Sequence, residues 1–239
     1  MIQPLGDSAV RVVFGKEISE QVHGKVRAFC RILEEMKPSG IIEWMPSYTA
    51  VTIFYDALHF SYKETEEWVK VLVKDLDSVE TIPARTWSIP VCYEEEFAPD
   101  IEGVGERLGL HPNEIIDRHT KPLYTIFMLG FIPGFPYLGG MDSSIAAPRL
   151  EKPRSSVPAG SVGIAGEQTG IYSLTSPGGW RIIGRTPLKL YDRKKTLPVF
   201  LEAGDKLRFQ AVTKQQFQEI QQKVEEGNFE LERLRGEQR

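Results

Sequence analysis

The chain has 239 residues, of which 41% are hydrophobic and 26% are charged, and its net charge is −4 at neutral pH. This composition is ordinary for a globular protein, and the acidic balance argues against a general nucleic-acid surface. No apolar run approaches the roughly 20 residues of a membrane helix, and the first residues lack the basic and then apolar layout of a secretory signal. We therefore expect a cytoplasmic protein that binds neither membranes nor nucleic acids.

The first 92 residues alternate short extended runs with two helical patterns. Apolar residues recur on one helix face over 18–36, and Ser61 with Glu64 forms a capping box that opens a second helix. Strands are predicted at 9–14, 41–46, 49–55 and 85–93. The resulting order, β-α-β-β-α-β, predicts a ferredoxin-like layer of helices on an antiparallel sheet.

The pattern changes twice further along the chain. Asp100 is expected to cap one helix, and Pro112 suits the first turn of the next. From residue 123 to about 210, short apolar runs alternate with Gly/Pro turns, which is typical of a barrel or a sandwich. A last helix follows Thr213. We predict an α+β protein with a first domain at 1–84, a β domain at 85–212, and a C-terminal helix with a charged tail at 213–239.

The sequence lacks a Walker A loop, an H-E-x-x-H motif and paired CxxC motifs. Ser161 in "PAGSVG" misses the G-x-S-x-G nucleophile elbow, and it would need a base from a distant part of the chain. His119 is the best-placed base, because it ends the helix that leads into a glycine-rich loop. The alternative is a helix-end histidine bonded to a carbonyl group. Both interpretations stay open, and no metal site is predicted.

Three glycine-rich segments stand out at 130–140, 157–170 and 176–187, each between predicted strands. Glycine lets backbone N–H groups approach a ligand, and clustered loops on a barrel are common binding sites. The stretch 149–195 also carries nine Lys/Arg against three Asp/Glu, which favours a bound anion or an acidic partner. Candidate binding residues are Phe135, Tyr137, Arg154, Gln168, Thr169, Trp180 and Arg181, and Arg185 joins Ser161 and His119 as a catalytic candidate. Alternatively, the glycines only permit tight barrel corners.

Three long motifs carry a family resemblance: "LGDSAVRVVFG", "GFIPGFPYLGGM" and the stretch from "APRLEKPR" to "RTPLKLYD". They resemble the allophanate hydrolase subunit 1 family, whose bacterial members are named as the B subunits of 5-oxoprolinase. The family includes the sensor kinase A inhibitor KipI, which the chain also resembles. The resemblance runs from about Pro4 to Gln210 and implies a ferredoxin-like domain followed by a cyclophilin-like β-barrel.

The resemblance also implies an activity. The 5-oxoprolinase B subunit would work with two partners, the A subunit of the enzyme and its C subunit, which is a related barrel protein. Together they would open 5-oxo-L-proline to L-glutamate. ATP would be a co-substrate, with magnesium and without a prosthetic group. The KipI branch implies a second role, which is to block autophosphorylation of a sporulation sensor histidine kinase. The chain could combine both roles, or it could be a dedicated kinase inhibitor without a catalytic role.

Overall fold

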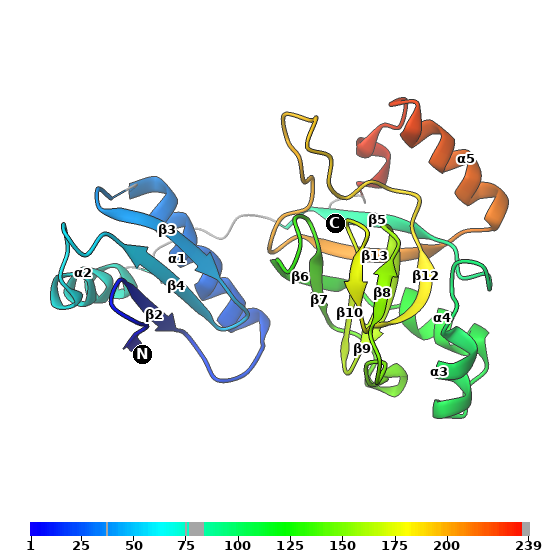
Figure 1. Ribbon diagram of the computed structural model, residues 1–239, viewed down its shortest axis with the longest axis horizontal. Coiled ribbons are helices and arrows are strands. Elements are labelled where there is room, and N and C mark those ends of the chain that lie inside the picture. Colours follow the sequence, from blue (N-terminus) through cyan, green and yellow to red (C-terminus); the bar gives the residue numbers. More distant parts are fainter. Residues whose placement is uncertain (37, 75, 77–83, 236–239) are drawn as a thin grey trace. The chain divides into compact units, whose positions relative to one another are not determined.

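The computed structural model describes residues 1–36, 38–74, 76 and 84–235 (Figure 1). The chain divides into two compact units, Met1–Pro83 and Ala84–Arg239. The C-terminal segment that begins at residue 213 belongs to the second unit. Each unit has its own hydrophobic core. No helix in the described ranges is long and apolar enough to cross a membrane.

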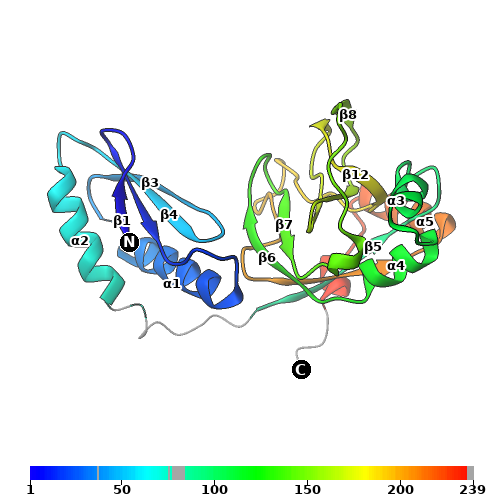
Figure 2. The same ribbon diagram turned by 90° about the horizontal axis from the view of Figure 1, so that it is seen from below.

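The first unit is a small sheet with two helices. Its sheet has the antiparallel order β1-β2-β4-β3, and β1 lies along one edge beside β2 (Figure 2). The Ser61–Glu64 capping box forms as predicted, with the Ser61 backbone N–H donating to Glu64 Oε2 at 2.8 Å. The elements are β1 (Ile2–Pro4), β2 (Ala9–Val13), α1 (Glu20–Met36), β3 (Ile41–Pro46), β4 (Ala50–Tyr55) and α2 (Tyr62–Lys74).

One face of this sheet is buried under the helices. Val10 and Val12 of β2 are two positions apart, so they point to the same face, as do Val51, Ile53 and Tyr55 of β4. Phe29 of α1 and Val69 of α2 pack against them and are fully buried. These two helices therefore supply the apolar stripes that the 3.6-residue periodicity predicts.

The strand at 85–93 does not complete this sheet, so that part of the β-α-β-β-α-β prediction is wrong. The observed strand, β5 (Thr86–Val91), belongs to the second unit and pairs in parallel with β13 (Lys206–Ala211). In the first sheet, the edge position next to β2 is filled by the three-residue strand β1 instead. The α+β class is nevertheless confirmed, with a small α/β sheet unit and a nearly closed barrel.

The second unit is built on a seven-stranded sheet of order β12-β9-β10-β7-β6-β13-β5. A separate hairpin pairs β8 with β11. Its remaining strands are β6 (Tyr124–Leu129), β7 (Pro136–Gly139), β8 (Arg154–Val157), β9 (Ser161–Ala165), β10 (Gln168–Ile171), β11 (Ser176–Gly178) and β12 (Arg181–Arg185). Its helices are α3 (Ile101–Leu108), α4 (Pro112–Thr120) and α5 (Lys214–Glu225), with short 3-10 turns at η2 (Ser143–Ile145) and η3 (Leu231–Leu234).

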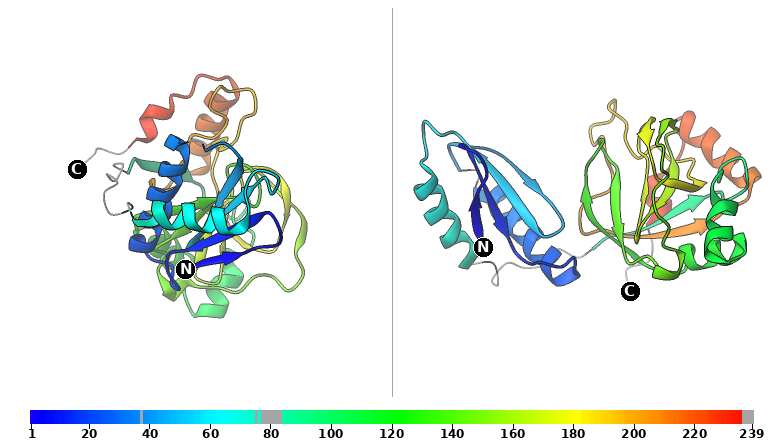
Figure 3. Two further views of the ribbon diagram at one scale, coloured as in Figure 1. Left: turned by 90° about the vertical axis from the view of Figure 1, so that its left-hand side faces the viewer. Right: turned by 60° about the horizontal axis from the view of Figure 1, so that its bottom comes forward.

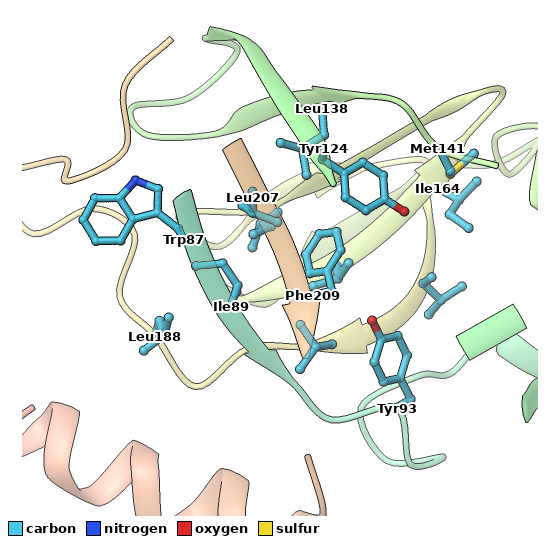
Figure 4. Packing of buried hydrophobic residues seen from close by; sticks show 14 of the residues in the cluster. Trp87, Ile89, Tyr93, Tyr124, Leu138, Met141, Ile164, Leu188, Leu207 and Phe209 are labelled. Atoms are coloured by element: carbon cyan, nitrogen blue, oxygen red, sulfur yellow. The ribbon is translucent and has the colours of Figure 1, made fainter. Parts of the chain in front are cut away.

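Backbone hydrogen bonds close the sheet into a barrel. Cys92, just beyond β5, donates its N–H to the Arg185 carbonyl at 2.8 Å, and Arg185 donates in return at 2.9 Å. The two outermost strands of the sheet are joined in this way. Buried side chains such as Ile89, Tyr124 and Phe209 fill the interior (Figure 4).

Candidate functional site

The three glycine-rich segments meet at one buried side chain, Phe135. Its ring lies edge-on to Tyr172 at a centroid distance of 5.3 Å and to Trp180 at 5.4 Å. It is also tilted against Tyr137 at 4.9 Å. Phe135 and Tyr137 lie in the first segment, Tyr172 lies just after the second, and Trp180 lies in the third. We call these four residues the aromatic cluster.

The aromatic cluster lies on the outer wall of the barrel. Ile183 of β12 belongs to the barrel core, whereas its neighbour Ile182 packs with the aromatic cluster. Ile171 and Tyr172 divide in the same way. Successive side chains of a strand point to opposite faces, so the aromatic cluster covers the outside of β10 and β12.

Two of the glycines make room for these rings. A Cβ at Gly170 would come within 2.9 Å of the Phe135 ring, and a Cβ at Gly178 would overlap the Tyr172 hydroxyl. The glycine-rich segments therefore serve close aromatic packing. Phe135 is 1% exposed and Trp180 5%, so these two residues, expected to line a pocket, form the interior of the aromatic cluster.

Basic side chains surround the aromatic cluster. The Arg149 guanidinium lies over the Trp180 ring at 6.0 Å, within cation–π range. Burial raises the pKa of Tyr172, and the positive charges of Arg149 and Arg154 act against that rise. Burial likewise raises the pKa of Tyr137, again opposed by Arg149. The outer face thus places cations beside the aromatic cluster, which suits an anionic group.

Arg154 is held by Asp100, the residue expected to cap α3. Asp100 occupies the N-cap position of α3 as expected, but its side chain makes no capping bond. Its carboxylate instead accepts from Arg154 Nη2 at 2.6 Å and from the Ile182 backbone N–H at 2.6 Å. The other terminal nitrogen of Arg154, Nη1, is buried and has no hydrogen-bond partner among the described residues. Arg154 therefore keeps a donor free beside the aromatic cluster.

The other two arginines of the prediction lie in different surroundings. Arg181 donates from Nε to the Pro148 carbonyl at 2.9 Å, which ties β12 to the segment before Arg149. Arg185 donates from Nε to the Ala159 carbonyl at 3.0 Å. Arg185 also lines a cavity of about 150 Å³ between the barrel and α5. The predicted arginines therefore divide between the outer aromatic face and this cavity.

His119 is fully buried and linked to Thr169. Its Nε2 lies 2.9 Å from Thr169 Oγ1, whose hydroxyl donates to the Gly163 carbonyl, so Nε2 must be the donor. Its Nδ1 then accepts from the Tyr93 hydroxyl at 2.8 Å. The ring stacks on Phe209 at 4.4 Å, and burial lowers the pKa of His119 to about 3. The structure therefore favours a neutral packing histidine, bonded to two hydroxyls and not to a carbonyl.

Ser161 and Gln168 begin adjacent strands of the barrel. Ser161 is 2% exposed, and its backbone carbonyl accepts from the Tyr172 N–H at 2.8 Å. Both ring nitrogens of His119 are engaged by other groups, so His119 does not serve Ser161 as a base. Gln168 pairs with Ala165 across the β9–β10 turn. Neither residue joins the aromatic cluster.

Comparison with known proteins identifies the family. Residues 1–201 match the family model described as "Carboxyltransferase domain, subdomain C and D". The chain is 44% identical over 231 residues to the 5-oxoprolinase B subunit of Bacillus subtilis, covering 90% of this chain and 94% of that protein. It is 38% identical over 208 residues to the 5-oxoprolinase B subunit of Haemophilus influenzae. The chain belongs to the family of 5-oxoprolinase B subunits.

Solved structures show the same fold in proteins of different length. TTHA0988 matches with a TM-score of 0.75 and 33% identity, covering 89% of this chain but only 40% of that longer one. PH0987 from Pyrococcus horikoshii matches with a TM-score of 0.54 and 45% identity over its whole length. The fold of this 5-oxoprolinase homologue therefore occurs both as a separate chain and as part of a larger one.

Sequence reasoning missed several residues of the site in this 5-oxoprolinase homologue. Arg149 lies in the basic stretch but outside the three glycine-rich segments. Phe131, the second residue of the first segment, is 64% exposed and has a φ of 67°, which is uncommon for a residue with a side chain. Gln221 and Glu225 of α5 line the cavity beside Arg185. Gln221 and Glu225 are four residues apart, so the sequence indicated that they share a helix face. It did not indicate which part of the barrel that face covers.

Proposed function

We propose that the chain is the B subunit of an ATP-dependent 5-oxoprolinase, which opens 5-oxo-L-proline to L-glutamate with hydrolysis of ATP. The observation that carries the proposal is the 44% identity to a 5-oxoprolinase B subunit over nearly the full length of both chains. The reaction adds water across the lactam C–N bond. The carbonyl carbon gains the hydroxyl group, and the ring nitrogen gains the proton.

The proposal includes the A and C subunits of the enzyme as partners. Acyl transfer to water needs an activated nucleophile and a positioned acid or base. His119, the best-placed base, is locked between Tyr93 and Thr169 and stays neutral. The longer TTHA0988 chain, of which this fold is 40%, supports the idea that the chain functions next to further domains. We infer that it contributes binding and positioning within a shared active site.

Magnesium would accompany ATP. In the described ranges, no group of three His, Cys, Asp or Glu side chains is placed to hold a metal ion. A magnesium ion bound with a nucleotide keeps several waters and takes ligands from the phosphates, so it needs few protein carboxylates. The cations around the aromatic cluster, chiefly Arg149 and Arg154, are suited to neutralise phosphate or carboxylate oxygens.

The test is ATP-dependent release of glutamate from 5-oxo-L-proline by the purified chain assembled with the A and C subunits. We expect release with the complete set and none when this chain is omitted. Arg185→Ala should lower turnover without preventing assembly. Arg193 lies in an exposed turn, so Arg193→Ala should leave turnover unchanged. An intact complex that releases no glutamate in the presence of ATP would contradict the proposal.

The competing hypothesis, a dedicated inhibitor of a sporulation sensor histidine kinase, rests on the resemblance alone. The same preparation separates the two. The chain is added to the kinase in stoichiometric excess, and labelled phosphate on the kinase histidine is followed. Unchanged autophosphorylation would remove the inhibitor hypothesis. Inhibition together with glutamate release would show that both roles reside in one chain.

A further inference from the structure

The cavity beside Arg185 is small and has walls of different chemistry. Its volume is about 150 Å³, roughly the space of five water molecules. Drug-sized ligands and nucleotides need pockets of about 300 Å³ or more, so this cavity suits only a compact molecule. The barrel contributes Ala159, Ser173 and Arg185 to Lys189, and α5 contributes Phe217, Gln221, Val224 and Glu225. Figure 3 shows α5, in orange, beside the barrel.

Arg185 has most of its hydrogen-bonding capacity unused. Its Nε–H donates to the Ala159 carbonyl, and the four N–H groups of the two terminal nitrogens have no partner among the described residues. No described carboxylate lies within ion-pair distance of it. Burial lowers the pKa of Arg185, and the charge of Glu96, which is itself paired with Lys214, acts against this. A half-buried arginine fork with open donors is suited to bind a carboxylate.

The position of Arg185 is fixed by the backbone. Its N–H and C=O both bond to Cys92 where the barrel closes. The next residue, Thr186, donates its N–H to the Gly160 carbonyl at 2.9 Å. Any side chain at Gly160 would collide with the Thr186 carbonyl, so glycine is required for this approach. The arginine therefore projects from a rigid seam, as a binding residue should.

The opposite wall carries acceptors. Gln221 donates to Glu225 Oε1 at 2.9 Å, one helical turn along α5, and both line the cavity. The helix is anchored by Phe217, which is 3% exposed and packs on Phe97 at 4.4 Å. A ligand between the two walls meets a cation on the barrel and a carboxylate with an amide on α5. Apolar contacts from Pro187, Leu188 and Val224 lie between them.

We propose that this space, the Arg185 cavity, binds a compact carboxylate that also carries an N–H donor. The carboxylate pairs with Arg185, and the N–H group faces Gln221 and Glu225. The choice of probes rests on the proposed function. 5-Oxo-L-proline presents a carboxylate and a lactam N–H, and L-glutamate presents a carboxylate and an ammonium group. The cavity would thus hold the substrate or the product of the proposed reaction.

The test is titration of the ¹⁵N-labelled full chain with 5-oxo-L-proline, with L-glutamate and with inorganic phosphate, in separate arms. We expect shifted amide signals along 185–189 and 217–225 with the first two probes and a weaker response to phosphate. A stronger response to 5-oxo-L-proline would assign the cavity to substrate, and a stronger response to L-glutamate would assign it to product. Arg185→Gln should weaken binding by roughly tenfold or more, since it removes charge-assisted hydrogen bonds.

Matched variants keep the test decisive. Arg193→Gln removes an exposed arginine of the same basic stretch and should leave the affinities unchanged. Glu225→Gln should reduce the affinity for L-glutamate more than that for 5-oxo-L-proline. The nitrogen of L-glutamate is a positively charged ammonium group, whereas the lactam N–H of 5-oxo-L-proline is neutral. Shifts confined to other regions, equal affinities for wild type and Arg185→Gln, or no binding of any probe would overturn the inference. Binding by a chain whose full complex releases no glutamate would reject the proposed function and retain the cavity.

Discussion

At the scale of single residues, His119 illustrates how burial decides chemistry. In the sequence, His119 was a candidate base because it ends a helix before a glycine-rich loop. In the structure it donates to Thr169 and accepts from Tyr93, while its ring stacks on Phe209. Desolvation penalises the charged form, so the pKa falls from 6.5 to about 3. A residue chosen for reactivity serves instead to hold α4 against the barrel.

This burial predicts how stability depends on pH. Between pH 6.5 and about 3, the unfolded chain binds a proton at His119 that the folded chain does not. Lowering the pH through this window should therefore reduce the free energy of unfolding, by at most about 1.4 kcal/mol per pH unit, and the contribution is flat above pH 6.5. The free energy of unfolding is measured by urea unfolding at a series of pH values. Hydrogen exchange of barrel amides at the same pH values provides a second measurement.

The comparison variant is His119→Gln. It should be less stable at pH 7, by roughly 1–3 kcal/mol, because it disturbs the bonds to buried hydroxyls. Its free energy of unfolding should nevertheless fall less steeply between pH 6.5 and 4, since glutamine does not titrate. Parallel curves for the two proteins would show that His119 does not carry the pH dependence.

At the scale of elements, one carboxylate joins β5 to the turn before β13. Asp205 is 4% exposed and accepts from Arg85 Nε at 3.0 Å, Arg85 Nη2 at 2.7 Å and Trp87 Nε1 at 2.9 Å. It also accepts from the Glu202 backbone N–H at 3.0 Å. The two ends of the barrel sequence are thus fixed together by one side chain.

We expect Asp205→Asn to lower the free energy of unfolding by about 2 kcal/mol. Breaking a fully buried pair costs about 3–5 kcal/mol, and the partial exposure of Arg85 reduces that figure. Glu202→Gln is the matched control, because Glu202 also contacts Arg85, at 3.1 Å, but its side chain is 63% exposed. The control should change stability by less than about 1 kcal/mol. Equal losses in the two variants, measured by thermal unfolding, would contradict this assignment.

Local pattern predicted most elements but not their partners. The helix and strand periods placed α1, β3 and β4 correctly, because each depends on residues a few positions apart. The strand at 85–93 was also found, yet it was assigned to the first sheet. Its actual neighbour, β13, begins 120 residues later, at Lys206 against Thr86. Pairing across such a separation leaves no local signal.

The sequence predicted which segments form the candidate site but not how their side chains are arranged. The density of glycine and aromatic residues correctly located the segments that meet at Phe135. It did not show that Gly170 and Gly178 make room for rings. The sequence also could not separate Arg154, which faces the aromatic cluster, from Arg185, which faces α5. Arg154 lies on β8, which pairs with β11, whereas Arg185 ends β12, where the barrel closes on Cys92, and neither pairing has a local signal.

At the scale of the whole molecule, the two units have separate cores and internal polar networks. The Arg85–Asp205 pair and the barrel closure between Cys92 and Arg185 both lie within the second unit. We therefore expect a fragment of residues 84–239 to fold alone. A dispersed ¹⁵N spectrum and a cooperative thermal transition would demonstrate it. An aggregated fragment, or one without cooperative unfolding, would show that the barrel needs residues 1–83.

The parallel pairing of β5 with β13 has a consequence for synthesis. In the first unit, the strands from Ile2 to Tyr55 find their partners within a short stretch of chain, so this unit can form while translation continues. The first strand of the barrel has no permanent neighbour until Lys206–Ala211 has left the ribosome. During that interval the edge of β5 has no partner strand, so we expect the barrel to form only after β13 has been synthesised.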